Sequence, residues 1–245
     1  MLRKFFVDVG YVALIYSKWV KRYPIHYFSV PVLLPLGTFV AFAFTIAPQN
    51  RLYAVSGPIV FSITVNTLLY IAQFVGEDRV VHRLSLFATL PVSPVAYGFG
   101  VAISVTLRGL ISISSILILA TWYFGLTVTW SWLALIPTLL LSFTAGVLIG
   151  LIIAWSTRNP RALFSIAQFT TFGVGLFAPV FYPLSVLPYP LRLVAEVIPT
   201  TYSSTLVRDS LTGDMGAYLS SFVPLLVITG ILLLVVMKRT KWRQE

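Results

Sequence analysis

The sequence predicts an all-α integral membrane protein, and its composition and length are the observations that indicate it. Apolar residues make up 58% of the chain and charged residues only 10%, whereas soluble proteins carry about 25% charged residues. The mean hydropathy of +0.92 also excludes intrinsic disorder, which requires low hydrophobicity and high charge. Because a spanning helix takes about 20 apolar residues, the 245 residues accommodate six spans and leave no room for a soluble catalytic domain.

Six apolar runs predict the membrane-spanning helices of one transmembrane domain, residues 1–245. The predicted spans are 25–47, 53–75, a crossing within 95–124, 132–155, 162–182 and 217–237. Residues 183–200 lie between the last two spans and contain four prolines. Since proline interrupts a helix, we expect this segment to be a broken re-entrant stretch at the outer membrane surface.

The distribution of cations predicts the orientation in the membrane. Thirteen of the 17 Lys and Arg residues lie in the N-terminal segment, the loops after the second and fourth spans and the C-terminal tail, and three lie in the opposite loops. Cytoplasmic loops are enriched in Lys and Arg, so we expect both termini in the cytoplasm of a multi-pass plasma-membrane protein. This surplus indicates lipid headgroups rather than nucleic acid as the partner. Arg108, in the third span, has no obvious acidic partner, and we expect it to snorkel to the interface.

The first 22 residues predict a helix that lies in the membrane interface. Their apolar residues recur at spacings of three and four, and the cations fall largely elsewhere. Such a helix directs its cations toward anionic headgroups. Two interpretations of residues 1–23 stay open: a simple membrane anchor, or an elbow helix that also contacts a cytoplasmic partner.

Polar residues inside the spans predict contacts with a partner helix or a cavity. The second span carries a stripe on one helical face, and the fifth span adds two polar residues; these candidate pathway residues are Ser62, Asn66, Tyr70, Gln73, Gln168 and Thr171. Interhelical hydrogen bonds are one interpretation, and a wet substrate pathway, which the four-residue stripe favours, is the other. In the fourth span, small residues spaced by four predict close helix packing: Ser142, Gly146, Gly150 and Ala154.

The sequence shows no catalytic or metal site. Neither His26 nor His82 lies in a zinc-protease motif, cysteine is absent, and the chain has no phosphate-binding loop of the G-x-x-x-x-G-K-[ST] type. The predicted spans also lack the carboxylates typical of ion-coupled transporters. A lipid-modifying membrane enzyme and a secondary transporter are therefore the disfavoured alternatives, and we expect another polypeptide to supply the energy.

Two segments carry a resemblance to a known family. The first is GEDR at 76–79, followed by Leu84, Phe87, Leu90 and PVSP at 91–94; the second is APVFYP at 178–183, followed by LP at 187–188, IPTTY at 198–202, RD at 208–209 and Gly213. Together with six spans and an N-terminal elbow, they resemble the ABC-2 type permeases, the membrane subunits of ATP-binding cassette exporters. The likeness covers essentially the whole chain. HRLS at 82–85 replaces the Gly-Thr step usual in the family's first loop.

The resemblance implies that residues 76–94 form a cytoplasmic coupling loop that docks on a nucleotide-binding subunit. The residues expected to couple are Glu77, Asp78, Arg79, Arg83, Leu84 and Phe87. The loop is charged, with an apolar side formed by Val80, Leu84 and Phe87, and such a strip marks a partner site when it is exposed. A helix lying on lipid headgroups is the alternative.

The resemblance also implies the assembly. Two nucleotide-binding subunits would bind ATP and Mg, this chain would bind no cofactor, and a second permease copy or a paralogue would complete a path lined by spans one, two and five. The implied activity is export of an amphipathic or lipid-like substrate, such as a drug, a lipid or a lipid-linked glycan.

Overall fold

A computed structural model describes residues 2–22, 25, 29–127, 129–157 and 159–239, and within these ranges the ordered elements are helices. The elements are α1 (Leu2–Arg22), η1 (Ser29–Leu33), α3 (Leu34–Thr45), η2 (Pro48–Asn50), α4 (Arg51–Thr64), η3 (Val65–Leu69), α5 (Tyr70–Val80), α6 (Arg83–Thr89), α7 (Pro94–Phe124), η4 (Trp130–Ala134), α8 (Leu135–Ser156), α9 (Pro160–Phe177), η5 (Leu184–Val186), α10 (Tyr189–Val197), α11 (Pro199–Thr212) and α12 (Met215–Arg239). His26 lies outside the described ranges, and so do three of the cations that were counted for the orientation: Arg158, Lys241 and Arg243.

Four helices in the described part of the chain are long and apolar enough to cross a membrane: Arg51–Val80, Pro94–Phe124, Ser131–Ser156 and Met215–Lys238. They correspond to the predicted spans two, three, four and six. The predicted spans one and five correspond to shorter helices, an apolar helix over Pro31–Thr45 and the 18-residue α9. An all-α membrane protein is therefore confirmed, whereas the six-span arrangement and the cytoplasmic termini stay predictions.

The helix Arg51–Val80, here called the central helix, forms the core of the bundle. It runs through α4, the π-helical turn η3 and α5 without a break, and it contacts α7, α8, α9 and α11. Its most apolar stretch is 94% buried, against 17% for the corresponding stretch of α12. The central helix is thus packed against protein on all sides, while α12 leaves most of its surface for lipid.

Small residues allow α8 to approach the central helix closely. A Cβ atom built at Gly150 would lie 2.9 Å from the backbone oxygen of Thr67, and one at Gly146 would collide with the Thr67 hydroxyl. Further along α8, Ser142 Oγ donates a hydrogen bond of 2.8 Å to Ser203 Oγ on α11. The partners of this small-residue face are helices of the same chain, which the sequence left undecided.

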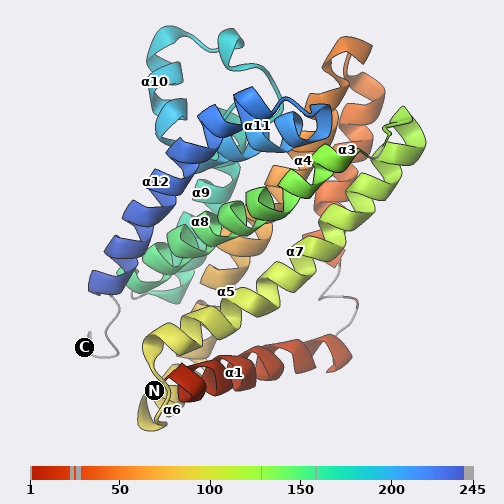
Figure 1. The fold of residues 1–245 in the computed structure, drawn as a ribbon. Helices are drawn as coiled ribbons and strands as arrows, with labels where there is room; N and C mark the ends of the chain where they lie inside the picture. The colour runs from red at the N-terminus through yellow and green to blue at the C-terminus, as the bar shows by residue number, and fades with distance from the viewer. Residues whose placement is uncertain (1, 23–24, 26–28, 128, 158, 240–245) are drawn as a thin grey trace.

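Helix α1 lies across one end of the bundle and packs on α7 (Figure 1). Val9, Val12 and Tyr16 form its buried face, whereas Phe6 and Tyr11 are exposed. The contact is close because Gly100 of α7 has no side chain; a Cβ there would lie 2.5 Å from Val12. The predicted amphipathic helix is present, and the choice between anchor and elbow stays open.

The proline-containing segment 183–200 folds into η5, α10 and the start of α11, at the end of the bundle opposite α1 (Figure 1). The prolines fall where helices begin, at Pro188, Pro190 and Pro199, which is where a missing N–H costs least. The break that the sequence predicted is therefore present, and its position relative to the membrane stays a prediction.

We predict that Gly150→Ala lowers the apparent unfolding temperature in detergent, because its Cβ would overlap a backbone oxygen that cannot rotate away. Overpacking of this kind costs about 1–3 kcal/mol. Gly230→Ala is the matched control, since a Cβ at Gly230 meets nothing within 4 Å and alanine favours a helix by about 1 kcal/mol. Equal unfolding temperatures for the two variants would contradict the close packing of α8 on the central helix.

Candidate functional site

The candidate site lies at the end of the bundle that carries α1 and α6 (Figure 1), which we call the basic end because the first turn of α1 carries Arg3 and Lys4 and the end of α12 that lies here carries Lys238. Here the central helix continues to Val80, and α6 follows after a turn in which His82 adopts a left-handed conformation with φ of 54°. Helix α7 begins directly after Ser93. The Ser93 Oγ accepts a hydrogen bond from the Ala96 N–H at 3.1 Å and so caps the N-terminus of the helix. Residues 76–94 therefore form a helical corner between the central helix and α7.

Asp78 is the centre of a buried polar cluster at this corner. Its Oδ2 accepts hydrogen bonds from the hydroxyl groups of Tyr16 and Tyr97, the latter at 2.7 Å. Its Oδ1 accepts from Arg83 at 2.8 Å, which also makes an ion pair. These four residues come from α5, α1, α7 and α6, so one carboxylate connects four helices; we call them the Asp78 cluster.

The environment of the cluster explains why it is tightly bound. Asp78 is fully buried, and Tyr16 and Tyr97 are at most 1% exposed. A buried charge is costly unless it is paired and hydrogen-bonded, and hydrogen bonds to a charged group are stronger than neutral ones. Burial and the neighbouring Asp78 carboxylate raise the pKa of the Tyr16 hydroxyl, so Tyr16 keeps its proton and remains a donor.

The structure corrects the expectation that Phe87 belongs to an exposed strip, and it buries Asp78, one of the residues expected to couple. Because α5 extends past Gly76, its helical register turns Asp78 into the bundle. Phe87 is 5% exposed, and its ring packs against Tyr97 with centroids 5.2 Å apart. Leu84 is partly buried against the same core.

Other apolar residues of the corner are exposed instead. The corner between α5 and α6 presents four of them, here called the corner patch: Val80, Val81, Leu86 and Leu90. Of the predicted apolar side, Val80 alone belongs to this patch. The corner therefore exposes an apolar patch, but Leu84 and Phe87 of the predicted strip are not part of it.

Arg79 connects the corner to a further helix. Its guanidinium donates to the backbone oxygen of Thr157 and, at 2.6 Å, to that of Ala154. Both carbonyls belong to the C-terminal end of α8, where backbone oxygens lack helical partners and a cation is favourable. Arg79 is therefore engaged within the chain, at the end of the small-residue face of α8.

An open groove of about 710 Å³ runs between α5 and α9 at the basic end. Gln73 and Glu77 line it from α5, and Arg161 and Ser165 line it from α9. Gln73 Nε2 donates to Glu77 Oε1 at 3.1 Å. Glu77, unlike Asp78, is thus half-exposed and borders a space that a ligand or partner can reach.

The predicted pathway residues divide into two groups. Ser62, Asn66 and Thr171 are fully buried inside the chain, and Asn66 Nδ2 donates to the Ser62 backbone oxygen at 2.9 Å and to that of Pro31 at 3.3 Å. Gln168 is exposed on α9. Ser62 and Asn66 of the stripe are therefore buried where Gln168 is exposed, whereas Gln73 of the same stripe lines the groove between α5 and α9.

Arg108 lies in the interior rather than at the interface, so the expectation of snorkelling is wrong. It is 2% exposed, near the middle of α7. Its guanidinium carbon stands 4.4 Å from the centroid of the Tyr70 ring and 4.9 Å from that of Phe74, distances typical of cation–π contacts. The register of α7 directs Arg108 at the central helix, and a cation at this depth is costly and usually functional.

Sequence reasoning missed two members of the Asp78 cluster. Tyr16 belongs to the apolar face of the first 22 residues, and no local pattern distinguishes Tyr97 from its neighbours. A tyrosine on a buried helical face needs a hydrogen-bond partner for its hydroxyl group. This need is the sequence signal that points to a buried polar contact. The partner could not be identified, because 62 residues separate Tyr16 from Asp78 and 19 separate Tyr97 from it.

We predict that Asp78→Asn destabilises the protein by about 2–3 kcal/mol, because the amide keeps one acceptor but loses the charge that binds two tyrosines and an arginine. Glu77→Gln is the matched control, with a half-exposed side chain whose described hydrogen bond goes to Gln73. Thermal unfolding of the purified variants measures both. An Asp78→Asn variant as stable as Glu77→Gln would contradict a structural role for the cluster.

Comparison with known proteins places the fold in a family. The family model of the ABC-2 type transporter matches residues 10–212, which include the whole Asp78 cluster and the corner patch. A comparison with curated proteins gives no match. A match over most of the chain shows membership, and the protein therefore belongs to the ABC-2 type transporter family.

Proposed function

We propose that this protein is the permease subunit of an exporter whose nucleotide-binding subunits dock on the corner patch. Membership of the family implies an ATP-binding partner subunit. The observation that carries the docking site is the corner between α5 and α6, where Val81 and Leu86 are 55% and 63% exposed directly over the buried Asp78 cluster. An exposed apolar patch beside charged residues is typical of a protein–protein contact.

The Asp78 cluster supplies a mechanism for coupling. A subunit that binds ATP and moves the corner would pull on α6, and Asp78 joins that region to α1 through Tyr16 and to α7 through Tyr97. Arg79 adds α8 to the same unit. Because breaking such buried bonds is costly, α1, α5, α7 and α8 move together with α6 instead of the corner bending alone.

We predict that Leu86→Asp abolishes co-purification with the ATP-binding subunit and lowers ATP-dependent uptake of a fluorescent phospholipid analogue into inside-out vesicles at least about tenfold. A charge in the middle of an apolar contact typically costs 2 kcal/mol or more, which is about 30-fold in affinity. Val197→Asp is the control: it is 73% exposed, on α10 at the opposite end.

Each result of this comparison has a distinct meaning. Loss of the partner with normal membrane insertion supports docking at the corner patch. Full co-purification by Leu86→Asp excludes it. Uptake into vesicles of the opposite orientation, with none into inside-out vesicles, would contradict export.

The substrate route is proposed to run between two permease copies, along the groove between α5 and α9. Gln73 and Ser165 line this groove, and Gln168 is exposed further along α9. The mixed lining, with apolar Phe164 beside charged Glu77 and Arg161, fits an amphipathic substrate such as a drug, a lipid or a lipid-linked glycan. Ser62 and Asn66 lie on the same central helix but are buried. They would line the route when the helices that cover them move apart.

We predict that cysteines at Gln73 and Ser165 react with a water-soluble thiol reagent in the absence of ATP, since both line an open groove. Cysteines at Ser62 and Asn66 should react at least about tenfold more slowly because they are buried, and faster when the transporter turns over ATP. The native chain has no cysteine, so the background is clean. Buried sites that stay unreactive during turnover would mean that this stripe only connects helices.

A further inference from the structure

A second groove, made by α7, α8 and α12, has a different chemistry. It holds about 270 Å³. Helix α8 contributes Thr144 and Leu148, α7 contributes Ala102 and Thr106, and α12 contributes Leu233 and Met237. All three helices are among those long and apolar enough to cross a membrane, so the groove faces the hydrocarbon region.

The lining of this groove fits a hydrocarbon chain. None of its lining residues carries a charge, and its polar atoms include the hydroxyl groups of Thr106 and Thr144. Thr144 Oγ1 already donates to the Leu140 backbone oxygen at 2.7 Å. A groove whose walls are aliphatic and aromatic selects an occupant by shape and van der Waals contact, which is what drives packing inside a bilayer.

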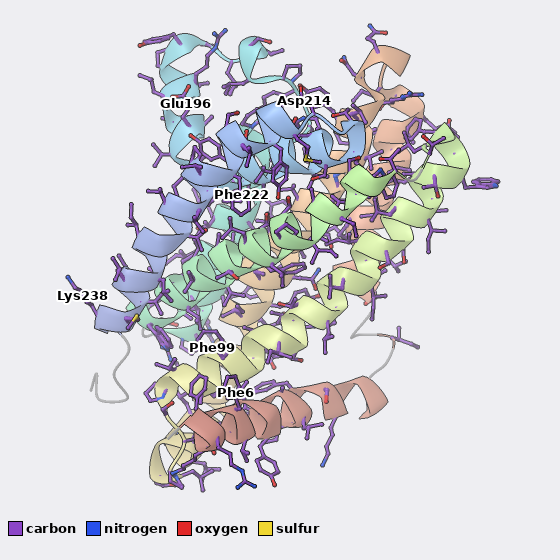
Figure 2. All side chains as sticks on the ribbon, in the orientation of Figure 1. Phe6, Phe99, Glu196, Asp214, Phe222 and Lys238 are labelled. Atoms are coloured by element: carbon purple, nitrogen blue, oxygen red, sulfur yellow. The ribbon has the colours of Figure 1, made fainter. Side chains whose placement is uncertain are left out.

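Cations lie at the end of the bundle where the groove-lining residues Phe99 and Met237 are found, and Figure 2 labels Lys238 at this end together with Phe99 and Phe6. Lys238 is exposed and directly follows the lining residue Met237. Phe99, another lining residue, contacts Phe5 of α1 with ring centroids 6.0 Å apart. The same first turn of α1 carries Arg3 and Lys4, both exposed.

We propose that this groove binds an anionic phospholipid, with an acyl chain between α7, α8 and α12 and the phosphate beside Lys238 and the first turn of α1. Cations near a membrane surface attract anionic lipids, and an apolar channel that ends at them matches the two parts of such a lipid. The bound lipid connects α12 with α7 and α1, which α12 needs because most of its surface is not covered by protein. The site uses other helices than the α5–α9 groove and does not depend on the proposed transport function.

Native mass spectrometry of the purified full-length chain tests the site after exchange into detergent with equal amounts of phosphatidylglycerol and phosphatidylcholine. We expect retained phosphatidylglycerol to exceed phosphatidylcholine at least about fivefold. The triple variant Arg3→Gln, Lys4→Gln and Lys238→Gln should bring this ratio close to one. Lys18→Gln, which removes an exposed cation further along α1 that lines neither groove, should leave the ratio unchanged.

A second variant tests the groove itself. Thr144→Trp fills the groove from an exposed position and should lower the retention of phosphatidylglycerol at least about fivefold. Ile118→Trp, at a 67% exposed position on α7 outside the groove, is the matched control and should retain the lipid. Equal retention of the two lipids by the native chain, or undiminished retention by Thr144→Trp, would overturn the proposal.

Discussion

The burial of the central helix along its whole length is the constraint on which the rest of the structure depends. A membrane helix can hydrogen-bond its backbone within itself, but its polar side chains need partners that lipid cannot supply. Covering Arg51–Val80 with α7, α8, α9 and α11 provides those partners. It also requires small residues where neighbours cross it, as at Gly146 and Gly150. The outer helices are arranged around this requirement, which leaves α12 mostly exposed to lipid.

The same constraint makes the basic end a mechanical unit. Asp78 lies where the central helix leaves the bundle, and its burial is tolerable because three donors from three other helices reach it. A buried ion pair contributes little to stability relative to well-packed apolar residues, yet breaking one is costly. Because the hydrogen bonds and the ion pair of Asp78 are costly to break, α1, α6 and α7 are expected to move as one body. Joint movement of these helices is what the proposed function requires, because an ATP-binding subunit has to move the membrane domain through them.

The α5–α9 groove and the α7–α8–α12 groove differ in the chemistry that they offer. The α5–α9 groove combines Gln73, Glu77 and Arg161 with apolar walls, whereas the α7–α8–α12 groove is uncharged and has cations only beyond its end. A transported molecule has to enter and leave, so mixed and open walls suit it. A lipid that supports the fold has to stay, and an apolar groove with a basic end suits that instead. This separation keeps the lipid away from the proposed substrate route.

Hydropathy, helical periodicity and missing N–H groups act locally, so the membrane class, four of the spans, the amphipathic first helix and the break at the prolines follow from the sequence. The family resemblance located the corner at residues 76–94. The directions of the side chains at that corner follow from the fold: Asp78 and Phe87 turn inward and Leu86 outward, and the central helix extends five residues beyond the predicted end. Likewise Arg108 is held by Tyr70 and Phe74 from another helix. Such contacts depend on helix register and crossing in three dimensions, which residues distant in the chain do not encode in any local pattern.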